Sequence, residues 1–262
     1  MAKENVNELV DKLTLFDDDL MSRVFDNNIE ATELMLRIIL GRNINVISVI
    51  GQDEIKSHEV GGRNITLDVH AIDVNGDEID IEVQGNSAGA HIRRARYHSS
   101  MVDSKMLDEG QEFRQLKDSY IIFIYKHDKF RKGLPVYHID RYIRETEELF
   151  DDGSHIIYVN GNYKGNDEIG QLMNDFRQTD SDKIHYAALA KGVKHFKDTE
   201  KGREQMCEAV EKYAKEYAVK EKMISVKNLM ENMKLTVDQA LNALGIQGDE
   251  RKTIINQLQN RN

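Results

Sequence analysis

The sequence predicts an α/β protein in which a mixed β-sheet is flanked by helices and followed by an α-helical C-terminal region. Two observations predict this class: β-branched segments alternate with segments of helical period, and the strand signals stop at about residue 181. The expected strands cover 43–50, 64–74, 78–84, 119–126 and 155–161. We therefore expect a sheet-containing domain over residues 1–180 and a helical region over residues 181–262.

The N-terminal part begins with two helices, at 4–13 and 28–41, where apolar residues recur at helical spacing and Gly41 stands as a C-terminal stop. The next two strands, 64–74 and 78–84, flank Asn75-Gly76. An Asn-Gly pair suits a tight two-residue turn, so this segment predicts a β-hairpin.

Helices are expected again at 88–108 and at 167–176, the second capped by Asn166. The C-terminal segments 184–198, 200–233, 236–244 and 249–259 all have a helical pattern, with Thr236 as a cap and Gly245 as a stop.

Composition limits the functional classes. The chain has 262 residues, 40% of them hydrophobic, and a formal net charge of −10, which argues against a protein that coats nucleic acid through a broad basic surface. Its single cysteine, Cys207, excludes an intramolecular disulfide and a cysteine-based zinc site. No long apolar run or basic leader occurs, so we expect a cytoplasmic protein without a membrane segment.

The hairpin carries acidic residues whose positions follow from its hydrophobic phase. Apolar residues alternate up to Val69 and then slip by one to Ile72. With a two-residue turn, a β-bulge at His70-Ala71 restores apolar pairing, with Val69 opposite Ile81. Asp68 then lies opposite Glu82, with Gln84 beside them.

Opposed carboxylates about 5 Å apart repel each other unless a cation lies between them. A hard divalent ion with oxygen ligands would remove the repulsion and could activate water against a phosphodiester. The alternative is a hairpin with one solvated face, on which Asp68, Asp80, Glu82 and Gln84 only contact water.

An Asp stands before the turn, and it is followed by IEVQ, then GAHIRRARYHSSMVDSKML and then the strand YIIFI. Together these segments resemble the PD-(D/E)XK nuclease family transposases, which are related to the Rpn recombination-promoting nucleases. The resemblance covers roughly residues 14–180. It implies a restriction-endonuclease-like fold and a hydrolase that cuts DNA with Mg²⁺ or Mn²⁺, in recombination or in mobile elements.

The resemblance also implies residue roles. Asp68 and Glu82 bind the metal, and the backbone carbonyl of Val83 is a further candidate ligand. Gln84 stands where the motif has Lys, which removes the cation that would orient water or stabilise developing charge. Glu33 is the candidate for the acidic residue on the preceding helix, with a surface ion pair to Arg37 as its alternative role.

The helix after the hairpin carries a local basic patch. Arg93, Arg96 and Tyr97 are three to four residues apart and share a face that suits a DNA phosphate, unless one of the arginines pairs with a core acid. Arg94 is expected on another face, in solvent. His91, His98 and His155 are given no role.

The C-terminal helices alternate in charge and are expected to mediate self-association into a homo-oligomer. A helix-turn-helix within 236–259 is a weaker interpretation because few Lys or Arg residues are present. Two other functions remain open. One is a catalytically inactive DNA-binding or protein-interaction protein derived from a transposase, and the other is an assembly protein unrelated to nucleases.

Overall fold

A computed structural model describes residues 3–57, 61–85 and 91–259. Within these ranges a six-stranded mixed sheet has the order β1-β2-β3-β4-β8-β5, and β6 and β7 form a separate small hairpin. The strands are β1 Val46–Ile55, β2 Ile65–Asp73, β3 Glu78–Gln84, β4 Ser119–Tyr125, β5 Val136–Ile139, β6 Tyr142–Ile143, β7 Glu148–Leu149 and β8 Ser154–Asn160. This confirms the α/β class with a mixed sheet flanked by helices.

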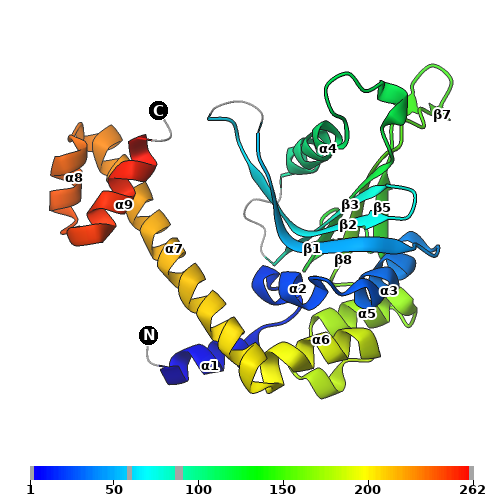
Figure 1. The fold of residues 1–262 in the computed structure, drawn as a ribbon, viewed down its shortest axis with the longest axis horizontal. Coiled ribbons are helices and arrows are strands. Elements are labelled where there is room, and N and C mark those ends of the chain that lie inside the picture. The colour runs from blue at the N-terminus through cyan, green and yellow to red at the C-terminus, as the bar shows by residue number, and fades with distance from the viewer. Residues whose placement is uncertain (1–2, 58–60, 86–90, 260–262) are drawn as a thin grey trace.

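Some helices lie on the two faces of this sheet and others extend away from it (Figure 1). They are α1 Lys3–Lys12, α2 Asp18–Phe25, α3 Ile29–Leu40, α4 Arg93–Met106, α5 Glu168–Phe176, α6 Ala187–Asp198, α7 Glu200–Met233, α8 Val237–Ala243 and α9 Gly248–Gln259. Helix α2 was not expected from the sequence. The cap of α5 is Asp167, which accepts from Gly170 N–H at 2.8 Å, so the prediction of Asn166 was wrong by one residue.

The β2–β3 hairpin has its extra residue in the turn and not in the strand. His70 pairs with Asp80 and Ala71 with Ile79, so the bulge predicted at His70-Ala71 is absent. The loop has three residues, closed by Asp73 N–H on Asp77 O, and Gly76 has a φ of 85°, which glycine adopts without a steric penalty. The predicted pair of Val69 with Ile81 is confirmed, because one added turn residue shifts the register as one bulge would.

The change of side-chain phase in β2 occurs at Asp68. Leu67 belongs to the hydrophobic cluster under α4, whereas Val69 belongs to the cluster on the opposite face of the sheet. In β1, the residue between the partners of Leu67 and Val69 is Gln52, which has a φ of 55°. Both strands therefore change phase together beside Asp68.

The two faces of the sheet are packed differently. The larger apolar core includes residues of α2, α3, α5 and α6 and extends to Met206 of α7. The smaller core lies under α4 and includes Ala95, Val102 and Phe123. Since β3 is in the middle of the sheet and covered on both faces, even its polar side chains are buried or nearly so.

The C-terminal helices extend away from the sheet. Helix α7 leads from the body to α8 and α9, which pack against its far part (Figure 1). This end has its own small core around Val226, Leu241 and Ile254. Thr236 caps α8 as predicted, and the structure adds a capping box with Gln239. The boundary at residue 180 remains a prediction, and Leu189 and Val193 beyond it pack into the main core.

Among the described residues, every helix is too short or too polar to cross a lipid bilayer.

Candidate active site

Asp68 and Glu82 lie at the point where the β2–β3 ladder ends. The last printed pair is Val69 with Ile81, and Asp68 and Glu82 are the next residue on each strand. Glu82 Oε1 accepts the Asp68 main-chain N–H at 3.1 Å, and Asp68 Oδ2 accepts the Val83 N–H at 2.9 Å. Each carboxylate is therefore held by the backbone of the strand that carries the other.

Burial raises the pKa of both acids. Glu82 is fully buried, and burial together with the charge of Asp80 raises its pKa to about 8. Burial and the charge of Glu82 raise the pKa of Asp68 well above its usual range. A third carboxylate, Asp18 at the start of α2, adds to the negative field on Asp68 and is itself exposed.

Arg94 points into the site, and the prediction that it lies in solvent was wrong. Its Nη2 pairs with Glu82 Oε2, and its Nη1 donates to Gln84 Oε1 at 3.0 Å. The guanidinium also lies over the Phe123 ring, 5.5 Å from its centroid. A cation is thus present beside Gln84, although it comes from α4 and not from β3.

Asp80 and His98 complete this buried group. His98 Nδ1 lies 2.7 Å from Asp80 Oδ2, and Arg94 Nε donates to His98 Nε2 at 3.2 Å. Burial raises the pKa of Asp80 well above its usual range, and burial lowers the pKa of His98. We call Asp68, Asp80, Glu82, Arg94 and His98 the Glu82 cluster.

The other motif residues of β3 lie beside this cluster. Gln84 is partly buried and accepts from Arg94. Val83 has its side chain in the main core on the opposite face of the sheet, while its N–H donates to Asp68. The role of its carbonyl as a metal ligand stays a prediction.

Glu33 is not brought to this cluster. Its Oε1 accepts the Val46 N–H at 2.9 Å, at the start of β1, where Val46 pairs with Asp73 beside the hairpin turn. Asp68 lies at the other end of the β2–β3 ladder. Arg37, its alternative partner, instead forms a bidentate pair with Glu168 of α5.

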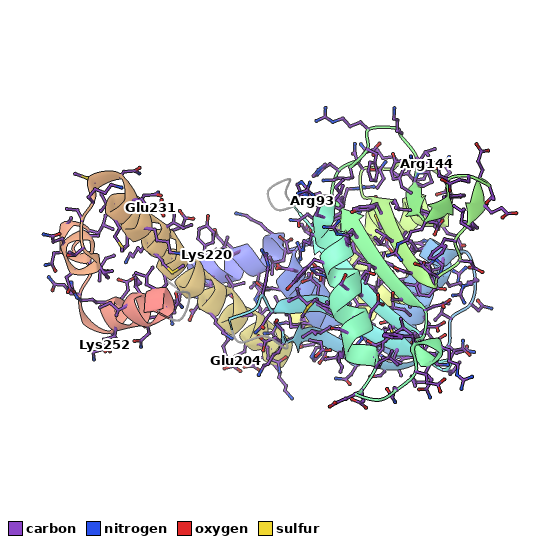
Figure 2. The ribbon with its side chains drawn as sticks, turned by 90° about the horizontal axis from the view of Figure 1, so that it is seen from above. Arg93, Arg144, Glu204, Lys220, Glu231 and Lys252 are labelled. Carbon is purple, nitrogen blue, oxygen red and sulfur yellow. The ribbon has the colours of Figure 1, made fainter. Side chains whose placement is uncertain are left out.

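The residues chosen for DNA contact lie at the first turns of α4. Figure 2 labels Arg93, which is exposed at the N-terminal end of this helix. Arg96 is also exposed, and the Tyr97 hydroxyl donates to the Arg63 carbonyl at 2.6 Å. Arg93 and Tyr97 line a cavity of about 530 Å³, and Arg96 does not.

This cavity connects the basic patch to the Glu82 cluster. Besides Arg93 and Tyr97 its lining includes Arg63, Asn64, Ile65, Thr66, His91, Arg94 and His98. Arg94 and His98 therefore contact the buried acids on one side and the cavity on the other. An anionic ligand in the cavity would meet a wall rich in positive charge and hydrogen-bond donors.

A second polar group, which we call the His70 cluster, lies on the same hairpin. His70 Nδ1 is 2.8 Å from Asp53 Oδ2, and its Nε2 is 2.8 Å from Glu78 Oε2. Lys105 of α4 donates to Asp53 at 2.9 Å. Burial would raise the pKa of Asp53, but hydrogen bonds from Lys105 and His70 lower it overall.

The Glu82 cluster has the composition of a cation site. Its three buried carboxylates outnumber its one guanidinium, that of Arg94, and burial lowers the pKa of its histidine. Asp80 Oδ1 has no hydrogen-bond partner among the described residues. Carboxylate oxygens of this kind suit Mg²⁺ or Mn²⁺, and Asp68, Asp80, Glu82 and His98 could supply ligands.

The sequence contains a signal for the inward side chains of α4. Arg94, His98, Met101 and Lys105 recur at helical spacing beside the buried Ala95 and Val102. The apolar stripe thus identifies the buried side of the helix, with Arg94 and His98 at its edge. Asp18 has no comparable signal, because only the fold brings its charge near enough to act on Asp68.

The family comparison identifies the family of the chain. The model of the PD-(D/E)XK nuclease family transposases matches residues 26–239. The match covers most of the chain and confirms the resemblance carried by the hairpin and the following helix. The match continues past residue 180 into α8. No curated protein and no solved structure matched the chain.

Proposed function

The chain belongs to the PD-(D/E)XK nuclease family transposases, and from this premise we propose that it is a divalent-cation-dependent endonuclease that hydrolyses DNA phosphodiester bonds. The family supports a nuclease-type function. The observation that carries the finer proposal is the reciprocal arrangement of Asp68 and Glu82, whose carboxylates are buried together at the end of the hairpin ladder. A role in recombination or in mobile elements is part of the proposal.

Asp68 and Glu82 would hold Mg²⁺ or Mn²⁺, with the Val83 carbonyl as a further ligand. The ion would supply a nucleophilic water at neutral pH and neutralise charge on the phosphate. Backbone N–H groups of Asp68 and Val83 orient the two carboxylates, so little side-chain freedom is lost when the ion binds. Asp18 is near enough to add negative charge from the solvent side.

Arg94 takes the electrostatic role that Gln84 cannot perform. Its guanidinium is the positive charge nearest to Glu82, and it lines the cavity in which a phosphate would bind. A fixed guanidinium stabilises negative charge that develops on phosphate oxygens. Gln84 accepts from Arg94 and so holds its orientation.

DNA would approach the cavity at the first turns of α4. Arg93 and Tyr97 line it and Arg96 is exposed nearby, so these three side chains are proposed to bind the DNA backbone. Because the chain is acidic overall, this contact should be local and sensitive to salt.

Plasmid cleavage with Mg²⁺ or Mn²⁺ tests the proposal. Asp68→Asn and Glu82→Gln preserve side-chain shape and should each abolish cleavage, since each removes a negative ligand. Glu148→Gln is the matched control, because Glu148 is an exposed acid on the separate β6–β7 hairpin. Cleavage that survives both core substitutions would remove these residues from the mechanism.

A catalytically inactive DNA-binding or interaction protein is the second candidate. The observation that favours it is Gln84 in the position of the motif Lys, with Arg94 engaged by both Gln84 and Glu82. Binding of DNA that is unchanged by EDTA, combined with no cleavage in either metal, would support this function over the first.

Self-association through the C-terminal helices is a separate proposal. Side chains of both signs, such as Lys220 and Glu231, project from α7 along the extended arm (Figure 2). Light scattering of the full chain at micromolar concentration tests it, and a monomeric mass would count against it.

A further inference from the structure

The carboxylate of Asp80 is the least satisfied buried group in the Glu82 cluster. Asp80 is fully buried, and its Oδ2 lies 2.7 Å from His98 Nδ1. Its Oδ1 has no hydrogen-bond donor within the described ranges. A buried carboxylate oxygen without a donor is costly, so a cation or a proton bound at this oxygen would stabilise the site.

Asp80, Glu82 and His98 each direct one ligand atom to the same place. These atoms, two carboxylate oxygens and one imidazole nitrogen, lie within 4.8 Å of one another. Ligands around one ion with bonds of about 2.1 Å are separated by about 3–4 Å, so small side-chain shifts suffice to enclose a cation. The first two residues share a face of β3, and His98 reaches them from α4.

We propose that Asp80, Glu82 and His98 form a second cation site, which shares Glu82 with the Asp68 position and prefers Mn²⁺ over Mg²⁺. The preference follows from His98, because imidazole nitrogen suits a transition metal better than it suits Mg²⁺. The inference rests on the proposed function only through the shared Glu82, since the ion would bind in the absence of DNA.

A proton is the competing occupant of this position. Asp80 and Glu82 offer carboxylate oxygens within 4.8 Å of each other, and burial raises the pKa of both, so a proton can neutralise one of them. A cation must displace that proton, so binding should release protons and become tighter as pH rises. If the carboxyl groups only share a proton and bind no cation, added Mn²⁺ would release no protons and no pH-dependent binding would be seen.

Arg94 competes with the cation for the same ligands. It pairs with Glu82 and donates from Nε to His98 Nε2, so the neutral ring carries its proton on Nδ1. An ion on Nδ1 requires the proton on Nε2, which then cannot accept from Arg94. Cation binding therefore separates Arg94 from His98, and removal of Arg94 should increase cation affinity.

The test measures Mn²⁺ binding to the full chain without DNA. Calorimetry gives the affinity, and pulsed electron paramagnetic resonance detects nitrogen ligands of the bound ion. The wild-type protein should show coupling of bound Mn²⁺ to an imidazole nitrogen. His98→Asn and Asp80→Asn should each lower Mn²⁺ affinity by about 10-fold or more, and His98→Asn should lose the nitrogen coupling. In His98→Asn, Mg²⁺ affinity should change less than Mn²⁺ affinity.

His155→Asn is the matched control, because His155 of β8 belongs to neither cluster and should leave the coupling intact. Wild-type Mn²⁺ without nitrogen coupling, or coupling that persists in His98→Asn, would overturn the inference. Nitrogen-coordinated Mn²⁺ without DNA cleavage would uphold it and defeat the nuclease proposal. DNA cleavage by a protein whose bound Mn²⁺ shows no nitrogen coupling would uphold the nuclease proposal and overturn the second cation site.

Discussion

The two buried polar clusters of the hairpin differ in how well their charges are matched. In the His70 cluster, both ring nitrogens have carboxylate partners 2.8 Å away, and Asp53 has a further bond from Lys105. In the Glu82 cluster, three carboxylates share Arg94 and His98, and Asp80 Oδ1 has no donor among the described residues.

This difference in charge matching leads us to expect a structural role for the His70 cluster and a functional role for the Glu82 cluster. Satisfied polar networks hold elements together, and the His70 cluster links β1, β2, β3 and α4. An excess of buried carboxylates stores unfavourable energy that a bound cation would relieve. The His70 cluster is therefore expected to support stability, and the Glu82 cluster to support activity at some cost in stability.

The largest effect should come from Glu82→Gln. We expect DNA cleavage to fall by more than about 100-fold, because the substitution removes a ligand shared by both proposed cation positions. Thermal unfolding in EDTA at pH 9, above the folded pKa of Glu82, should show that the variant is at least as stable as the wild type, since a buried charge has been removed. Initial rates with supercoiled plasmid measure the first effect, and a strongly destabilised variant would contradict the comparison.

His70→Ala should lower stability and leave DNA cleavage nearly unchanged. It leaves Asp53 and Glu78 without their shared partner and should lower the free energy of unfolding by about 3 kcal/mol. Urea unfolding measures this change. Lys105→Met is the control, because it removes a partly exposed partner and should cost less than about 1 kcal/mol. Cleavage per folded molecule should stay near the wild-type rate. A loss as large as that of Glu82→Gln would show that the clusters are not separate.

The pH dependence of stability isolates the Glu82 cluster. Because the folded pKa of Glu82 is about 8, above that of an unfolded glutamate, the folded state keeps a proton that the unfolded state has lost. Stability of the metal-free protein should therefore fall as pH rises from about 5 to 8, by on the order of 2 kcal/mol. The raised pKa values of Asp68 and Asp80 act in the same direction.

Urea midpoints in EDTA at pH 6 and pH 9 give the measurement. Glu82→Gln should show a smaller fall than the wild type, and added Mn²⁺ should remove much of it. His98, whose pKa is lowered, acts in the opposite direction below about pH 6.5, so the comparison starts near that value. An equal fall in both proteins would refute the assignment to Glu82.

The smallest effect should be that of Arg94→Gln on metal affinity. Loss of the guanidinium should tighten Mn²⁺ binding several-fold, because the competing charge is gone, while cleavage falls about 10- to 100-fold. Arg114→Gln is the control, since Arg114 is 81% exposed and pairs with Glu112, outside the Glu82 cluster. Weaker metal binding in Arg94→Gln would mean that Arg94 supports the cation site and does not compete with it.

Much of the hairpin could be predicted from local pattern. Alternation is a property of consecutive residues, and one face of a strand is set by a period of two. The pairing of Val69 with Ile81 followed from this, although the extra residue was assigned to His70-Ala71 and lies instead in the turn. Either position changes the register by one residue, so the sequence pattern could not distinguish them.

The sequence by itself determined the α/β class, the hairpin and the adjacency of Asp68 and Glu82, because these depend on local periodicity and register. Only the tertiary structure decided which side chains complete the cluster. Helix α4 crosses the polar face of β3 and turns Arg94 and His98 inward, whereas α3 directs Glu33 to the Val46 N–H. Such contacts depend on how helices pack on a sheet, and neighbouring residues in the sequence do not encode that directly.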